Sequence, residues 1–207
     1  MPTRRGVQIV LAGLIWLWPL AAWPASVIEP GQASAFIEKL GNEAINALAP
    51  SDVDRKVREA RFQNLLDKGF AIKAIAKFVL GRHWRKADES QREQYLAVFE
   101  QLIVKSYTLR FEKYAGETFR VKSERADGKR GRMVETEIAR EGAPPLVVQW
   151  RIRKSKSDAS LKIVDVMVEG VSMVITQRSE FNAVIQRNGA GVDGLIRELE
   201  QKVAAFQ

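Results

Sequence analysis

The chain has 207 residues, no cysteine and one histidine, and its 33 lysine and arginine residues against 25 acidic residues give a net charge of +8 at pH 7. This composition excludes disulfide bonds, cysteine-based catalysis and metal sites built from several histidines. The length is sufficient for one hydrophobic core, which has to stabilise the fold without covalent crosslinks.

The first 25 residues have the layout of a secretory signal peptide. Arg4 and Arg5 precede an apolar stretch over residues 7–22, and Trp-Pro-Ala-Ser follows. The stretch is shorter than the ~20 residues of a membrane-spanning helix. We therefore predict that residues 1–25 direct export and are cleaved, leaving a single domain over residues 26–207. Outside the cytoplasm, the basic charge favours an anionic membrane surface or an acidic partner protein over nucleic acid.

The following block has the periodicity of amphipathic helices, with apolar residues three and four positions apart. The first of these helices is stopped by Pro50. Asp88, followed three residues later by Gln91, forms a capping-box pattern that opens the longest helix. The predicted helices cover residues 32–49, 54–67, 71–80 and 89–113.

From residue 119 the apolar pattern changes to the alternation of strands. Phe119 and Val121 alternate with charged residues, and the same pattern returns around residues 134–138, 146–153 and 161–168. Asp-Gly at residues 127–128 and Gly-Ala-Pro at residues 142–144 supply turns. The simplest arrangement is a meandering antiparallel sheet of about four strands.

The last block returns to helices. Ser172 is expected to cap a helix that reaches about Arg187 and stops at Asn-Gly, and Asp193 is expected to cap a final helix. The predicted fold class is therefore α+β, a twisted antiparallel sheet covered by amphipathic helices. Periodicity alone does not distinguish a filled core from an open pocket between these layers.

Few residues are candidates for catalysis. His83 lies at a helix end between two large side chains, where a surface or capping role is expected. Asp165 and Glu169 form a possible acid/base couple in an apolar strand. The structural interpretation is favoured: Asp165 satisfies a helix start or an arginine, and Glu169 caps a turn.

Nucleic-acid binding has one weak candidate, the strand in which Trp150 lies between Gln149 and Arg151. Alternation places Trp150 on the same side as Val148 and Ile152, toward the core. Arg151 and the similarly placed arginine two residues later then form a solvated basic face.

Several motifs resemble one known family. They are residues 165–173 (Asp-Val-Met-Val-Glu-Gly-Val-Ser-Met), residues 176–181 (Thr-Gln-Arg-Ser-Glu-Phe), residues 78–87 (Phe-Val-Leu-Gly-Arg-His-Trp-Arg-Lys-Ala), residues 91–95 (Gln-Arg-Glu-Gln-Tyr) and Phe99. Together they resemble the MlaC family of periplasmic phospholipid-binding proteins, also called the toluene-tolerance family. The resemblance extends from about Ala33 to Phe206.

The resemblance implies a carrier of a diacyl phospholipid between an outer-membrane lipoprotein complex and an inner-membrane ABC lipid transport complex, which maintains the lipid asymmetry of the outer membrane. Such a carrier is expected to be a monomer that holds acyl tails in an apolar cavity between sheet and helices, and it needs neither a catalytic residue nor a cofactor. Matching positions place Gln149, Trp150, Val171, Met173 and Ile175 at the cavity. Side-chain alternation adds Tyr107, Val121 and Val148.

A basic face of Lys105, Arg110, Arg151 and Arg153 is expected either to meet acidic partners or lipid headgroups, or only to keep the protein soluble.

Three alternatives to the phospholipid carrier remain open from the sequence. The first is a related carrier of a hopanoid-type lipid. The second is a periplasmic enzyme on the same fold, which would require Asp165 or Glu169, and the third is a scaffold with a filled core.

Overall fold

The computed structural model describes residues 27–50, 52–111, 116–140, 142–189 and 191–206. The predicted signal peptide, residues 1–25, lies outside this part of the chain, as does the end of the helix predicted over residues 89–113. Within the described residues, no helix combines the length and the apolar character needed to cross a membrane.

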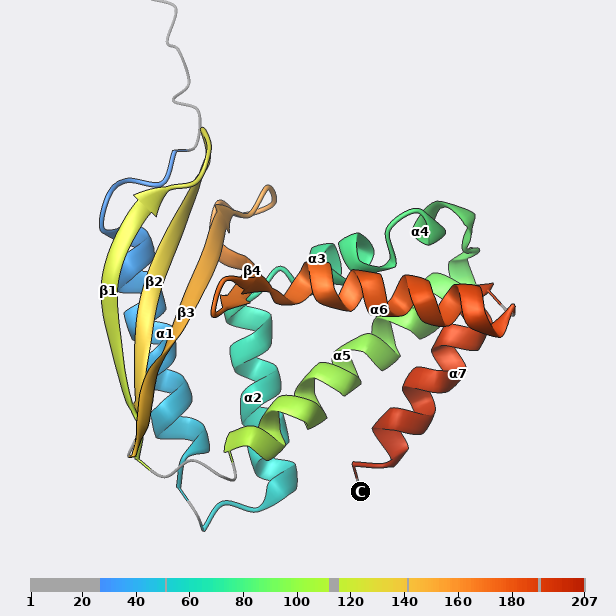
Figure 1. Cartoon of the computed structure of the whole chain (residues 1–207), viewed down its shortest axis with the longest axis horizontal. Coiled ribbons are helices and arrows are strands. Elements are labelled where there is room, and N and C mark those ends of the chain that lie inside the picture. The colour runs from blue at the N-terminus through green and yellow to red at the C-terminus, as the bar shows by residue number, and fades with distance from the viewer. Residues whose placement is uncertain (1–26, 51, 112–115, 141, 190, 207) are drawn as a thin grey trace, which may run out of the picture.

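The chain order is helices, then a sheet, then helices, which confirms the predicted α+β class (Figure 1). The amino-terminal helices are α1 (Gln32–Leu48), α2 (Arg55–Gly69), α3 (Ile72–Leu80), α4 (His83–Lys86) and α5 (Glu89–Phe111). The strands are β1 (Thr118–Ala126), β2 (Gly131–Arg140), β3 (Ala143–Lys154), β4 (Leu161–Val168) and β5 (Val171–Ser172). The last helices are α6 (Met173–Asn188) and α7 (Gly191–Ala204).

The strands form one antiparallel meander in the order β1-β2-β3-β4-β5. The four long strands were predicted, whereas β5 was not, because it has only two residues. It pairs with β4 across a two-residue turn in which Glu169 and Gly170 both have positive φ, 49° and 79°. This tight hairpin places the end of the sheet directly before α6.

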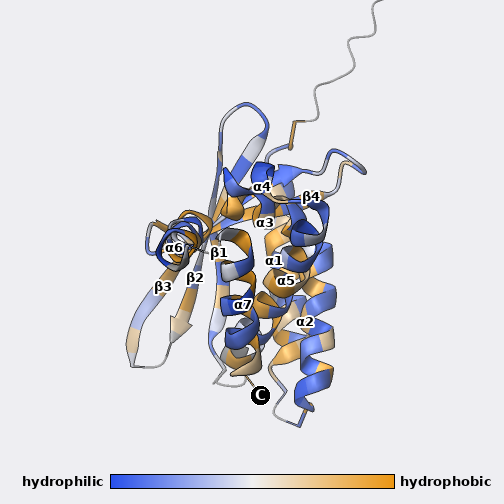
Figure 2. Cartoon of the chain, turned by 90° about the vertical axis from the view of Figure 1, so that its right-hand side faces the viewer, coloured by the Kyte–Doolittle hydropathy of each residue, from blue (hydrophilic) through white to orange (hydrophobic). Residues whose placement is uncertain are grey.

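Within the described residues, two separate hydrophobic clusters stabilise the molecule. The helical core joins α3, α5, α6 and α7 around Tyr95, Phe99 and Phe181, whose ring centroids lie 5.7 to 6.3 Å apart. The sheet core joins α1 to the inner face of the sheet and includes Ile37 and Ile152. Figure 2 shows α2 with hydrophilic residues on its outer side and hydrophobic residues toward α5. The space between the two cores is therefore bounded by apolar surfaces.

Local signals set most helix ends. The capping box of α5 is confirmed: the Gln91 backbone N–H donates to Asp88 Oδ1 at 2.8 Å, and the Asp88 N–H donates to Gln91 Oε1 at 3.2 Å. Ser172 caps α6, because its Oγ accepts from the backbone N–H of Ile175 at 3.2 Å. The cap predicted at Asp193 is wrong. Helix α7 begins two residues earlier, and the Asp193 carboxylate instead accepts from Gln91 Nε2 at 2.8 Å.

Candidate functional site

A cavity of about 500 Å³ lies between the two cores. Its wall is assembled from α1, α2, α3, α5, α6 and the first four strands, and most of the lining is aliphatic or aromatic. The helices contribute residues such as Leu40, Ala44, Phe62, Ile72 and Ile103, and the sheet contributes Phe119, Ile138, Leu146 and Val166. An apolar, partly open space of this size is typical of a site for a small hydrophobic ligand.

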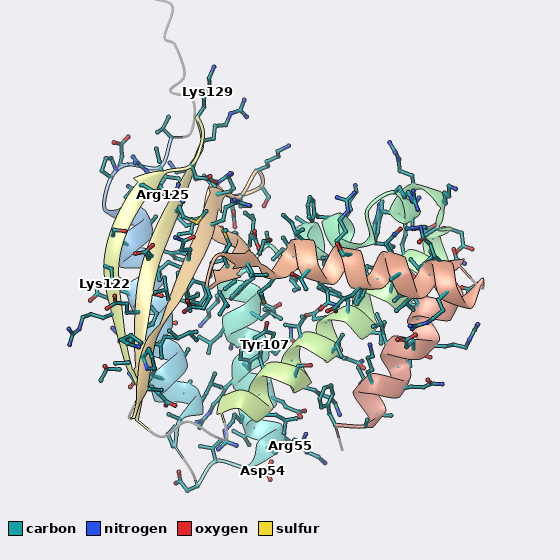
Figure 3. All side chains as sticks on the ribbon, in the orientation of Figure 1. Asp54, Arg55, Tyr107, Lys122, Arg125 and Lys129 are labelled. Carbon is teal, nitrogen blue, oxygen red and sulfur yellow. The ribbon has the colours of Figure 1, made fainter. Side chains whose placement is uncertain are left out.

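Two aromatic side chains illustrate how the lining is oriented. Tyr107 projects from α5 toward α2, where its ring stacks on Phe62 with centroids 6.2 Å apart (Figure 3). Trp150 lines the cavity from β3, and its Nε1–H donates to Thr136 Oγ1 at 2.9 Å. Because the indole N–H is satisfied within the sheet, Trp150 adds ring surface to the cavity without an unpaired donor.

Asp165 is the buried charge in the cavity wall, with a relative exposure of 2%. Its Oδ2 lies 3.1 Å from Arg151 Nη1 and accepts from Ser172 Oγ at 2.8 Å, while its Oδ1 accepts from the Val174 backbone N–H at 3.4 Å. The carboxylate thus satisfies both an arginine and a helix start, as the structural interpretation of the sequence predicted. Through these contacts the Asp165 carboxylate links the start of α6 to β3 of the sheet.

The other catalytic candidates are also engaged in local structure. Glu169 Oε1 accepts from the Val147 backbone N–H at 2.8 Å beside the β4–β5 turn. The His83 ring nitrogen lies 3.0 Å from Asn182 Oδ1, and neither His83 nor Glu169 lines the cavity. Among the described residues, no group of three or more His, Cys, Asp or Glu side chains is placed to hold a metal ion.

The residues expected at the cavity divide into two groups. Tyr107, Trp150 and Met173 line it. The other five lie elsewhere: Val121 packs against the sheet core, Val148 is buried in the sheet, Gln149 donates to Glu135 Oε2 at 2.8 Å, and Val171 and Ile175 are 53% and 55% exposed. Gln149 lies outside because side chains alternate along a strand, so it faces away from Trp150. The residues on α1, α2 and α3 were not anticipated, because an amphipathic stripe gives the same signal for a filled core.

The two β3 arginines of the expected basic face are paired with carboxylates of the protein. Arg151 and Arg153 both pair with Asp127, and Arg151 also pairs with Asp165. Partial burial raises the pKa of Asp127, but the hydrogen bond and charge of Arg153, followed by those of Arg151, bring that pKa below its ordinary value. Lys105 is half-buried, and the side chain of Arg110 lies outside the described residues.

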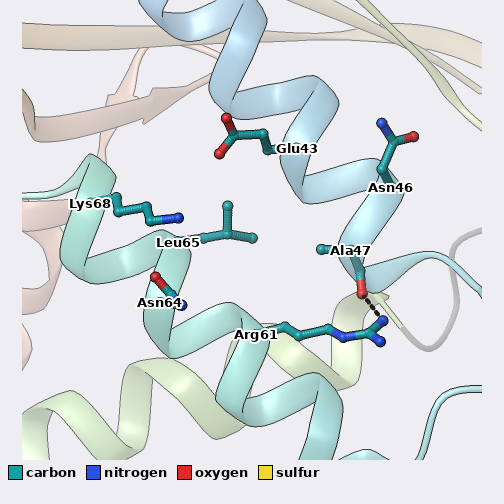
Figure 4. A pocket seen from close by; sticks show the side chains of 7 residues that line it. All are labelled: Glu43, Asn46, Ala47, Arg61, Asn64, Leu65 and Lys68. Carbon is teal, nitrogen blue, oxygen red and sulfur yellow. Dashed lines mark hydrogen bonds between the residues drawn. The ribbon is translucent and has the colours of Figure 1, made fainter.

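A second, shallow space of about 490 Å³ lies between α1 and α2 and is open to solvent. We call it the α1–α2 groove. Its residues are Glu43, Asn46 and Ala47 from α1, and Arg61, Asn64, Leu65 and Lys68 from α2 (Figure 4). Arg61 Nη1 donates to the Ala47 carbonyl oxygen at 2.9 Å. Leu65 lines both this groove and the apolar cavity.

The fold and its cavity define an α+β protein with a partly open space suited to an apolar ligand. The chain belongs to the MlaC family, because the family model described as MlaC protein matches residues 38–201. It is 24% identical over 128 residues to the intermembrane phospholipid transport system binding protein MlaC of Haemophilus influenzae, a match that covers 61% of this chain and 59% of that relative.

The fold is also found in a solved structure. The phospholipid-binding protein from Ralstonia solanacearum, determined in complex with a phospholipid, is 22% identical to this chain and superposes with a TM-score of 0.72. The match covers 84% of this chain and 98% of the other. It confirms the arrangement of helices around an antiparallel sheet.

Proposed function

We propose that this protein binds a diacyl phospholipid by its acyl chains in the cavity and carries it through the periplasm. The observation that supports this most directly is the cavity itself, which is apolar and whose buried polar groups, Asp165 and the Trp150 N–H, are satisfied by the protein. Hydrocarbon is the ligand chemistry that such a wall accommodates.

The relatives support the choice of ligand and pathway. One is named a binding protein of an intermembrane phospholipid transport system, and the other is described in complex with a phospholipid. With the predicted signal peptide, this favours a monomeric carrier of one domain, residues 26–207. It moves phospholipid between an outer-membrane lipoprotein complex and an inner-membrane ABC transport complex, and thereby maintains outer-membrane lipid asymmetry.

The energetics explain why such a carrier needs no catalytic group. Two acyl chains hold about 30 methylenes, and at ~0.8 kcal/mol each their transfer from water is favourable by on the order of 24 kcal/mol. A bilayer offers the same chains nearly the same environment, so the cavity has only to match it. Net affinity for a membrane lipid is therefore small, and the direction of transport is set by the partner complexes.

The test is native mass spectrometry of the mature protein from a periplasmic fraction, followed by organic extraction. We expect about one diacyl phospholipid per chain. The variant Ala44→Trp places a large ring in the cavity and is expected to lose the lipid, whereas Ala35→Trp, at an exposed site on the same helix, is expected to retain it.

Three other results would each contradict a different part of this proposal. A hopanoid in the extract would select the related hopanoid-type carrier in place of the phospholipid carrier. An unliganded wild-type chain that takes up no lipid from vesicles would contradict both carriers. Equal lipid content in Ala44→Trp and the wild type would show that the ligand does not occupy this cavity.

A further inference from the structure

Exposed apolar side chains gather where α3 meets the start of α6. Among the described residues, five large hydrophobic side chains are exposed, and three of them are Phe78 on α3, Val171 on β5 and Ile175 on α6. The two helices run side by side (Figure 1). Arg178 follows Ile175 by three positions on α6, and its guanidinium carbon lies 4.9 Å from the centre of the Phe78 ring. Phe78 and Ile175 therefore flank the same arginine.

The surface around these side chains is basic. We call it the α3–α6 face, and its six exposed residues are Lys73, Ala74, Lys77 and Phe78 from α3, and Ile175 and Arg178 from α6. Within the described part of the chain, none of its lysines and arginines forms an ion pair with a carboxylate. The segment over residues 70–87, which contains α3 and α4, has no acidic residue, and its basic residues are Lys73, Lys77, Arg82, Arg85 and Lys86.

The α3–α6 face is separate from the cavity, although the same two helices contribute to both. Helix α3 lines the cavity with Ile72, Ile75 and Val79, and α6 does so with Val174 and Gln177. None of the six residues of the face lines the cavity. Contact of this face with another surface therefore does not require that the cavity be empty or filled.

The mixture of side chains on the face favours a membrane surface over a protein partner. Lysine is depleted from protein–protein interfaces, whose centres are apolar. Lysine and arginine beside exposed aromatic and aliphatic side chains are instead typical of surfaces that bind anionic bilayers. There the apolar side chains enter the boundary between headgroups and acyl chains, while the cationic groups stay at the level of the lipid phosphates.

We propose that the α3–α6 face binds the surface of a bilayer that contains anionic phospholipid. Phe78 and Ile175 insert at the headgroup boundary, and Lys73, Lys77 and Arg178 contact lipid phosphates around them. The small number of inserted side chains makes this binding reversible. The inference goes beyond the proposed function, because it assigns a membrane contact to a surface outside the cavity.

The experiment is vesicle flotation of the mature protein as purified. One set of vesicles contains equal parts of phosphatidylglycerol and phosphatidylcholine, and the other contains phosphatidylcholine alone. We expect the wild type to float with the anionic vesicles only, and added salt to release it. Ile175→Ser should lower the partition coefficient about threefold, because less apolar surface is inserted. Lys73→Glu should lower it about tenfold, because it replaces an attraction by a repulsion.

Two matched controls lie on α2, at the end of that helix farther along the chain from α3. Val57→Ser removes another exposed apolar side chain, and Lys56→Glu makes the same change in net charge as Lys73→Glu. Both are expected to stay within about twofold of the wild type. This result would show that the α3–α6 face, and not total charge or total exposed apolar surface, determines vesicle binding.

The remaining outcomes overturn the membrane contact. A wild-type protein that floats with neither set of vesicles would leave the face to an acidic protein partner. Equal flotation with both sets would show that anionic lipid is not recognised, and equal losses in the controls would show that this face is not the one that binds. Failure of the proposed function is measured separately, by organic extraction of the same wild-type preparation, because flotation records where the protein lies and not what its cavity holds.

Discussion

The carboxylate of Asp165 lies where the sheet meets the start of α6. It accepts from Arg151 on β3, from the cap residue Ser172 and from the Val174 backbone N–H, and it is almost fully buried. A buried carboxylate with several donors holds its neighbours in one arrangement, because removing its charge leaves those donors unsatisfied. Asp165 therefore fixes the position of the helix that carries Met173 along the cavity.

Replacement of Asp165 tests this role. We expect Asp165→Asn to lower the free energy of unfolding by about 1–3 kcal/mol, less than for a fully isolated ion pair because Arg151 keeps its second partner Asp127. Urea unfolding followed by circular dichroism measures the change. Asp52→Asn, at an exposed site, is the control and should stay within about 0.5 kcal/mol of the wild type. A wild-type value for Asp165→Asn would show that the carboxylate does not hold α6.

Asp127 gives a prediction about pH. Its pKa is lowered in the folded protein by Arg153 and Arg151, which outweigh the opposing effect of burial. Its contribution to stability is therefore present above the ordinary value of 3.8 and is lost as pH falls through the lower, folded pKa. Asp127→Asn should be less stable than the wild type at pH 6, and the difference should shrink below about pH 4.

Urea unfolding of both proteins between pH 6 and pH 3 measures this convergence, with Asp52→Asn as the exposed control. A difference that stays constant across the range would mean that the Asp127 charge is not what stabilises the turn.

The sequence predicted that Asp165 would meet an arginine or a helix start. It did not predict the pairs of Asp127, because they depend on the register of β1 and β2 against β3, which local patterns do not specify.

At the scale of elements, periodicity located the long helices and strands to within a few residues, because each has one apolar face. Two short elements were missed. Helix α4 has one turn and β5 has two residues, so neither is long enough to show a period. The hairpin of β4 and β5 nevertheless positions the start of α6 at the cavity wall. Its turn requires positive φ at two consecutive residues, Glu169 and Gly170.

The contact between α1 and β1 leads to a prediction at this scale. A Cβ at Gly41 would lie 2.7 Å from Phe119 Cε1, closer than atoms can approach. Gly41→Ala is expected to destabilise the fold by about 1 kcal/mol, because overpacking costs about 1–3 kcal/mol and the better helix propensity of alanine offsets only part of it. Thermal unfolding measures the effect, and Asn42→Ala on the exposed side of α1 is the control. Greater stability of Gly41→Ala would mean that Phe119 moves freely into the cavity.

The whole molecule differs from a single-core domain in having a helical core, a sheet core and a cavity between them. This arrangement was not predictable from the residues, because an apolar stripe that lines a cavity is identical in sequence to one that fills a core. Tyr107 and Trp150 were placed correctly as inward-facing residues by their periodicity. Only the way in which α1, α2 and α5 pack around the inner face of the sheet reveals that they border an open space.

A ligand that binds in the cavity makes the stability of the molecule depend on its concentration. A lipid that binds only the folded state adds RT ln(1 + [L]/Kd), which is about 2.7 kcal/mol at a hundredfold excess over Kd. For a chain of this size that corresponds to a rise in Tm of roughly 5–10 °C. We expect extraction of the lipid to lower Tm by that amount and re-addition of phospholipid to restore it, as measured by differential scanning calorimetry. In Ala44→Trp, where the ring occupies the space, Tm should not respond to lipid. A wild-type Tm that is indifferent to lipid would show that the two cores are held together without a ligand between them.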